Sequence, residues 1–182
     1  MSTLSYRLAT LDNTDLIVSL VNSAYRGEIS KMGWTTEAHI LGGQRTDAEG
    51  IRRLLTEDNS LILLCYHDHQ AIGTVHIKKM EHGAYLGMLT IQPGLQGQGY
   101  GKQFLTAAEH TAQQTWEASK ITMSVITLRH ELIAFYQRRG YRRTGVVEDF
   151  PQDPRFGIPR VAHLQLEYLE KILDPQSQGQ AR

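Results

Sequence analysis

The chain has 182 residues, 41% hydrophobic and 21% charged, which is the composition of one ordinary globular domain. Its 19 Lys and Arg residues balance its 19 Asp and Glu residues, so charge gives no general attraction to nucleic acid or a membrane. No apolar stretch approaches the ~20 residues of a membrane-spanning helix. We therefore expect a single domain over residues 1–173, no nucleic-acid or membrane partner, and a polar, disordered tail over residues 174–182.

The single cysteine, Cys65, excludes an internal disulfide. It lies in the apolar run "LILLCY", which indicates a buried structural residue rather than a catalytic thiol. The N-terminal "MSTLSYRLATLDNTD" has neither the basic start nor the apolar segment of a signal peptide, so we expect a cytoplasmic protein.

The first third of the chain predicts one strand and two amphipathic helices. "YRLA" is typical of a short strand over residues 6–9, and apolar residues recur at helical spacing over residues 16–24 after the capping sequence "LDNTD". Residues 27–47 are expected to form a long loop. Asp47 is a candidate N-cap for a second helix whose inward face carries Ile51, Leu54 and Leu55.

The remaining segments predict the central sheet. "SLILLCY" and "AIGTVHIKKM" flank the polar residues 67–70, which indicates a hairpin, and "GAYLGMLTIQP" adds a third antiparallel strand. A helix over residues 104–116, a strand at "KITMSVIT" and a short helix at "ELIAFYQRRGY", ended by Gly140, are expected next. "YRRTGVVE" and "VAHLQLEY" are closing strands. The fold class is α/β, a mixed sheet with helices on both faces.

The most unusual segment is "IQPGLQGQGYGK", residues 91–102, which follows the third hairpin strand. It does not fit a P-loop, because Gln96 stands where the first Gly belongs and Gln103 where Ser or Thr must hold Mg²⁺. No register completes the dinucleotide pattern G-x-G-x-x-G. A third pattern, Q/R-x-x-G-x-G/A, is met by Gln96, Gly99 and Gly101, and backbone N–H groups at a helix start can hold a pyrophosphate without metal. Lys102 adds a cation, although a flexible Gly/Gln turn remains open.

The loop and the later "RHELIAFYQRRGY" together resemble the GNAT superfamily of N-acetyltransferases. "LTIQPGLQGQGYGKQFLTAAE" resembles the acetyl-CoA pyrophosphate motif of that family, and "RHELIAFYQRRGY" resembles its helix with a leaving-group tyrosine. The element order agrees over roughly residues 5–168. The resemblance implies a mostly antiparallel sheet whose middle strands, "YLGMLTI" and "ITMSVIT", splay apart around acetyl-CoA, with Gly87 compatible with a bulge near the splay.

The resemblance implies a cofactor channel built from strand backbone, the Gly-rich loop and the short helix. The implied cofactor-binding residues are Leu89, Thr90, Ile91, Gln96, Gly97, Gln98, Gly99, Tyr100, Gly101, Lys102, Leu128, Arg129, Leu132, Phe135 and Tyr136. One departure stands out, since many members carry Asn at the position of Arg129, and an Arg can donate hydrogen bonds but cannot accept them. The arginines at 138, 139, 142 and 143 could reach the 3′-phosphate of CoA.

The implied chemistry is direct acyl transfer, in which a neutral amine attacks the thioester. A backbone N–H near Leu89 would stabilise the oxyanion, and Tyr136 would be the general acid that protonates the departing thiolate. Tyr136 could instead be a core aromatic of an amphipathic helix.

The general base and the acceptor site are less constrained by the sequence. Glu37 in the long loop could take the amine proton or bind an ammonium, or could be a solvated loop charge. His76, Tyr85 and Glu148 are alternatives, and the base could be water. Trp34 and Tyr85 could wall the acceptor pocket. The turn His67–Asp68–His69 lacks a nearby third ligand, so no metal site is expected.

The leading function is an acetyl-CoA-dependent N-acetyltransferase acting on the primary amine of a small-molecule or amino-acid-like acceptor. A non-catalytic acyl-CoA-binding module of the same fold is one alternative, and acetylation of protein N-termini or lysine is another. The closing strands could also pair across two chains in a homodimer.

Overall fold

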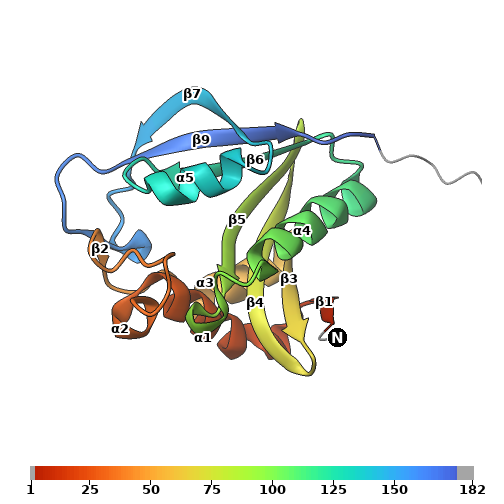
Figure 1. Ribbon diagram of the computed structural model, residues 1–182, viewed down its shortest axis with the longest axis horizontal. Coiled ribbons are helices and arrows are strands. Elements are labelled where there is room, and N and C mark those ends of the chain that lie inside the picture. Colours follow the sequence, from red (N-terminus) through yellow and green to blue (C-terminus); the bar gives the residue numbers. More distant parts are fainter. Residues whose placement is uncertain (1–2, 176–182) are drawn as a thin grey trace, which may run out of the picture.

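A seven-stranded sheet forms the centre of the computed structural model, which describes residues 3–175 (Figure 1). Its strands run in the order β1-β3-β4-β5-β6-β9-β7, and only the β5–β6 pair is parallel. The strands are β1 (Leu4–Leu8), β3 (Ser60–His67), β4 (Gln70–Met80), β5 (Gly83–Ile91), β6 (Lys120–Ile126), β7 (Arg142–Asp149) and β9 (Gln165–Ile172). The predicted mixed, mostly antiparallel sheet is confirmed.

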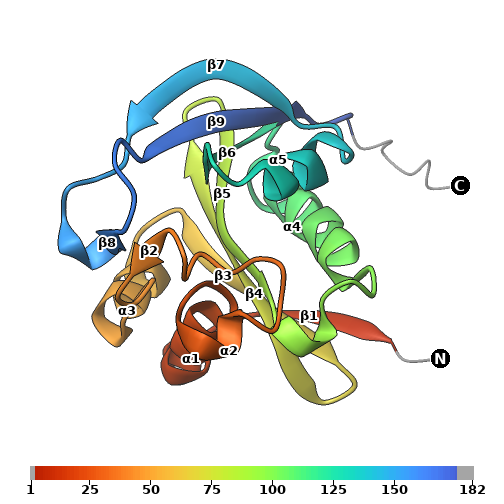
Figure 2. The same ribbon diagram turned by 60° about the vertical axis from the view of Figure 1, so that its left-hand side comes forward.

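Helices cover both faces of this sheet, as the sequence predicts (Figure 2). The helices α1 (Thr14–Tyr25) and α3 (Ala48–Thr56) pack on one face, and α4 (Tyr100–Trp116) and α5 (His130–Gln137) pack on the other. Side chains of β3 alternate between the two cores, with Ile62 and Leu64 facing α1 and α3 and Leu63 and Cys65 facing α4. A short helix α2 (Gly27–Ser30) follows α1.

The predicted start of α3 is confirmed. The Asp47 carboxylate accepts a hydrogen bond from the Gly50 N–H at 2.7 Å, which satisfies one of the free donors at the helix N-terminus. Ile51 is fully buried against α1, and Leu54 and Leu55 pack beside it.

Two features differ from the sequence prediction. Residues 27–47 contain a two-residue strand, β2 (Leu41–Gly42), which pairs with β8 (Ile158–Pro159) in a small second sheet. The last strand begins at Gln165 rather than at residue 161, because His163 adopts a φ of 54° and turns the chain before Leu164. Residues 176–182, most of the predicted tail, lie outside the described residues.

Within residues 3–175 no helix combines the length and the apolar character needed to cross a membrane.

Candidate active site

The strands β5 and β6 separate along their length. They pair only at Ala84 with Ile121 and at Tyr85 with Thr122. On the other side of β5 a bulge places two residues, Met88 and Leu89, opposite a single residue of β4. Met88 has a φ of 52°, which is strained for a residue with a long side chain. The predicted splay is therefore present, and the bulge follows Gly87 directly.

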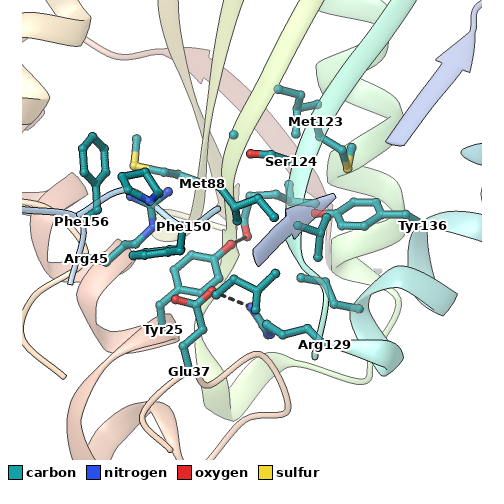
Figure 3. A pocket seen from close by; sticks show the side chains of 18 of the residues that line it. Tyr25, Glu37, Arg45, Met88, Met123, Ser124, Arg129, Tyr136, Phe150 and Phe156 are labelled. Carbon is teal, nitrogen blue, oxygen red and sulfur yellow. Dashed lines mark hydrogen bonds and ion pairs between the residues drawn. The ribbon is translucent and has the colours of Figure 1, made fainter. Parts of the chain in front are cut away.

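A cavity of about 190 Å³ lies in the opening between these strands, and we call it the strand cavity (Figure 3). Its walls are residues 85–89 of β5 and 123–126 of β6, with α1, α5 and the segments around residues 37, 45 and 150–156 closing the sides. The hydroxyls of Tyr85 and Ser124 lie 3.0 Å apart across the divide between the two strands. The strand cavity is thus a small compartment lined by both polar and apolar side chains.

A second cavity, of about 350 Å³, lies between the Gly-rich loop and α5, and we call it the loop cleft. It contains backbone of β5 at Leu89 and Ile91 and side chains of α5 at Leu132 and Phe135. Gly97, Gly99, Gly101, Lys102, Arg138 and Arg139 form the rest of its polar wall. Three cationic side chains and no carboxylate line this cleft, so it suits a polyanionic ligand.

The glycines of the loop present backbone rather than side chains to the loop cleft. Gly97 and Gly99 have φ values of 80° and 82°, and Gly99 is the N-cap of α4. A Cβ added at either position would meet nothing within 4 Å, so it would stand in the open space beside the loop. Because the N–H groups of the first helical turn have no intrahelical partner, this end of α4 is suited to hold an anion. Lys102, in that first turn, adds a positive charge.

Tyr136 lies where the two cavities meet, since its side chain lines both of them. The rings of Phe135 and Tyr141 pack edge-on against it at centroid distances of 5.3 and 5.6 Å and fix its orientation. Burial raises the pKa of its hydroxyl well above the usual range, so the group carries its proton at every physiological pH. Among the described residues its hydroxyl has no hydrogen-bond partner. A buried phenol with a free hydroxyl therefore lies between the strand cavity and the loop cleft.

Backbone groups of β5 also face the splay. The Gln92 N–H bonds to the Ile72 carbonyl of β4, so the N–H and carbonyl groups of its neighbour Ile91 point away from β4. The Ile91 carbonyl accepts a hydrogen bond from the Gln96 amide. In the bulge, the Leu89 carbonyl accepts from the Tyr25 hydroxyl.

Comparison with known proteins identifies the family. Residues 19–141 match the model of the acetyltransferase (GNAT) family, and this match spans the splayed strands, the Gly-rich loop and α5. The chain belongs to the GNAT acetyltransferase family. The family uses acetyl-CoA as donor, and the enzyme is an N-acetyltransferase of that family. A search of curated proteins finds no match.

Solved structures share the GNAT fold at low sequence identity. A ribosomal-protein-alanine N-acetyltransferase from Brucella melitensis superposes with a TM-score of 0.68 at 18% identity, covering 93% of this chain and 99% of that one. The spermidine/spermine N-acetyltransferase SpeG from Vibrio cholerae gives 0.65 at 14% identity, covering 93% of each chain. A protein assigned as a streptothricin acetyltransferase from Bacillus anthracis, solved with acetyl coenzyme A, gives 0.56 at 17% identity over 67% of each chain.

Most of the cofactor-binding residues that the resemblance implied line the loop cleft. Those that do are Leu89, Ile91, Gln96, Gly97, Gly99, Gly101, Lys102, Leu132, Phe135 and Tyr136. The cleft fits acetyl-CoA, because an anion site at one end leads along β5 backbone to Tyr136 at the other. Arg138 and Arg139 line it as well, whereas Arg142 and Arg143 do not.

Five of the implied cofactor residues lie elsewhere. Thr90 is buried on the opposite side of β5, and its hydroxyl bonds to the Met88 carbonyl. Gln98 is exposed outside the cleft, and Leu128 is 49% exposed outside it. The Tyr100 hydroxyl reaches back to His67 at 3.1 Å, so its ring leaves the cleft. Arg129 lines the strand cavity instead.

Gln96 joins the Gly-rich loop to the segment after α2. Its Oε1 accepts from the Trp34 N–H at 2.9 Å, and its amide donates to the Thr35 hydroxyl at 2.8 Å. Gly33 lies beside it, and a Cβ added there would meet Gln96 Oε1 at 2.5 Å, so the Gln96 side chain would have to shift. Trp34, which the sequence suggested as an acceptor wall, therefore lines the loop cleft, where its ring packs on Phe135 at 5.5 Å.

Glu37 is buried at 7% exposure, so it is not a solvated loop charge. Its Oε2 accepts from the Arg26 guanidinium at 3.1 and 3.2 Å, and its Oε1 accepts from Arg129 at 2.9 Å (Figure 3). Arg129 also donates to the Thr35 carbonyl at 2.6 Å. Glu37 lines the strand cavity, but both of its oxygens are bound to guanidinium groups.

The remaining candidates separate clearly. Tyr85 lines the strand cavity. His76 bonds to the Ser60 hydroxyl at 2.9 Å, lines neither cavity, and has its pKa lowered to about 4 by burial. Glu148 lies on the exposed strand β7 and accepts a hydrogen bond from the Tyr168 hydroxyl. Burial raises the pKa of Cys65 to about 12, so its thiol is not reactive.

Among residues 3–175 no cluster of three or more His, Cys, Asp or Glu side chains could hold a metal ion.

Sequence reasoning missed several residues of the strand cavity. Tyr25, Arg26 and Arg45 come from α1 and the long loop, and Phe150 and Phe156 come from the segment after β7. None of them belongs to a local motif. Only their bulk or charge within otherwise irregular segments could have marked them.

Proposed function

We propose that the protein transfers the acetyl group of acetyl-CoA to the primary amine of a small-molecule acceptor held in the strand cavity. The observation that carries this proposal is Tyr136, whose side chain lines both the loop cleft and the strand cavity. A donor thioester in the first cavity and an amine in the second would meet beside its hydroxyl. The volume of about 190 Å³ suits a small acceptor, because pockets for drug-sized ligands measure roughly 300–1,000 Å³.

When bound, acetyl-CoA supplies an activated carbonyl that a neutral amine can attack. Leu89 lines both cavities, and its backbone N–H is our candidate for stabilising negative charge on the carbonyl oxygen. The Tyr136 hydroxyl gives its proton to the departing sulfur. Burial raises the pKa of the phenol, so the group holds its proton until the sulfur departs.

Glu37 supports the site as an anchor rather than as the general base. Its two carboxylate oxygens accept three guanidinium hydrogen bonds, so neither is free to take a proton from the amine. The amine proton instead leaves through water in the strand cavity, which is a sufficient base when the acceptor reacts as its neutral form.

The experiment is a thiol-release assay with acetyl-CoA and a panel of amino acids, polyamines, aminoglycosides and short peptides. We expect turnover of at least one small amine, and Tyr136→Phe to lower kcat at least tenfold with little change in acetyl-CoA affinity. Tyr168→Phe is the matched control, since that phenol lines neither cavity. CoA binding without turnover on any acceptor would support the non-catalytic module, and turnover of peptides alone would support a protein acceptor. An unchanged kcat in Tyr136→Phe would remove Tyr136 from the mechanism.

A further inference from the structure

The strand cavity has an excess of positive charge. Three guanidinium groups, those of Arg26, Arg45 and Arg129, and one carboxylate, that of Glu37, line it. Glu37 is bound to both Arg26 and Arg129, and Arg26 also donates to three backbone carbonyls, those of Gly42, Gln44 and Phe156. The single carboxylate that lines the cavity is therefore already paired with two guanidinium groups, and the third guanidinium has no carboxylate in the lining to pair with.

Arg45 is that third cation. Its side chain forms no hydrogen bond or ion pair with any residue between 3 and 175. An arginine keeps its charge and offers five donors in a planar fork, which matches a carboxylate. A cation that lines a cavity without a partner in the protein is suited to an anionic ligand group.

The backbone that carries Arg45 is held in place. The Asn22 side chain, from α1, accepts hydrogen bonds from the Arg45 and Thr46 N–H groups at 2.8 and 3.2 Å. The amide of Asn22 donates back to the Thr46 carbonyl at 2.9 Å. A ligand would therefore meet a guanidinium on a backbone that is already ordered, which lowers the entropy cost of binding.

The position of Arg45 sets the direction of an acceptor. In Figure 3, Arg45 lies at one end of the strand cavity beside Phe150 and Phe156, and Tyr136 lies at the other end. In the proposed reaction the thioester sulfur leaves beside Tyr136, so the attacking amine must lie at the Tyr136 end of the cavity. An anionic group on the same molecule would then point to Arg45, and an apolar part would lie near Met88, Phe150 and Phe156, which line the cavity as well.

We propose that the acceptor is a small primary amine that also carries a carboxylate, of the α-amino-acid type with an apolar side chain, and that Arg45 binds this carboxylate. The proposal rests on the proposed function and narrows its substrate class. A polyamine does not suit the same cavity, because its charges would face three guanidinium groups and the one carboxylate present is taken.

The test compares substrates that differ only in this anionic group. Steady-state thiol release is measured with leucine and leucinamide, with methionine and methioninamide, and with spermidine. The amide has the less basic amine and hence the larger neutral fraction near pH 8, so a preference for the acid cannot come from amine basicity. We expect kcat/KM for each acid to exceed that of its amide at least tenfold, and spermidine to be the poorest acceptor.

The variant Arg45→Gln then tests the assigned residue. We expect the acid-to-amide ratio of kcat/KM to fall at least tenfold, mainly through a higher KM for the acid, and Arg45→Lys to restore part of it. Arg52→Gln, at an exposed arginine of α3 that lines neither cavity, should keep the wild-type ratio.

The outcomes separate the two proposals. Amides or spermidine used as well as the acids, or an unchanged ratio in Arg45→Gln, would overturn the assignment of Arg45 while leaving N-acetyl transfer intact. No acetylation of any amine or peptide, with acetyl-CoA bound, would overturn the proposed function itself and this inference with it.

Discussion

Removing the charge of Glu37 should destabilise the fold more than it slows the chemistry. The carboxylate and its two guanidinium partners are all buried, with side-chain exposures of 9% for Glu37, 4% for Arg26 and 6% for Arg129. In Glu37→Gln a single amide oxygen remains to accept, and its NH₂ group faces donors. Removing one partner of a buried ion pair costs about 3–5 kcal/mol, because the remaining charge is left without compensation. We expect a loss of about 3 kcal/mol in the free energy of unfolding.

The assay is urea unfolding followed by circular dichroism, with acetyl transfer measured on the same samples at a temperature where both proteins are folded. Glu28→Gln is the matched control, because the Glu28–Lys31 pair is exposed and should contribute nothing measurable. A change below 1 kcal/mol for Glu37→Gln would refute the anchoring role. If that small change came with a collapse of kcat, Glu37 would instead be the general base.

Two further outcomes follow from buried and backbone groups. Burial lowers the pKa of His76 from its usual 6.5 to about 4. Between these two pH values the unfolded protein binds a proton at His76 that the folded protein does not. The free energy of unfolding should therefore fall by up to about 3 kcal/mol as the pH drops from 6.5 to 4. In urea titrations at several pH values, His76→Gln should reduce this pH dependence, and His82→Gln, at an exposed residue, should not. If the free energy of unfolding varied with pH equally in the two variants, His76 would not be the group responsible. Gly99→Ala, at a φ of 82°, should weaken acetyl-CoA binding at least tenfold, as measured by calorimetry. Gly94→Ala is the control and should change the affinity little, because Gly94 has open space around it and no positive φ. Equal affinities of the two variants would argue against the loop as the anion site.

The donor side of the site could be predicted because its determinants are local in sequence. Gly97, Gly99 and Gly101 lie within five residues, and a Cβ added at Gly97 or Gly99 would meet nothing within 4 Å, so the backbone there is uncovered. The helix that follows begins at Tyr100, so the anion site is fixed by one strand, one loop and one helix start. Side-chain direction was harder to predict, since Tyr100 turns to His67 and leaves the cleft.

The strand cavity could not be predicted because distant segments build it. Tyr25, Arg45 and Phe156 come together only through the folding of α1, the long loop and the segment before β8. Arg26 illustrates the reason, since its guanidinium bonds to the carbonyls of Gly42, Gln44 and Phe156. Such contacts leave no periodic or motif-like trace in the sequence.

Arg129 shows how a motif position can take a new role without loss of the site. The resemblance placed it against the cofactor, where an amide would both donate and accept, but a guanidinium only donates. Its donors go to Glu37 and to the Thr35 carbonyl, and the Thr35 hydroxyl accepts from Gln96, which also bonds the Ile91 carbonyl. One run of hydrogen bonds thereby links the start of α5 to the Gly-rich loop and to β5. The residue that departs from the family pattern thus holds together the segments that frame the loop cleft.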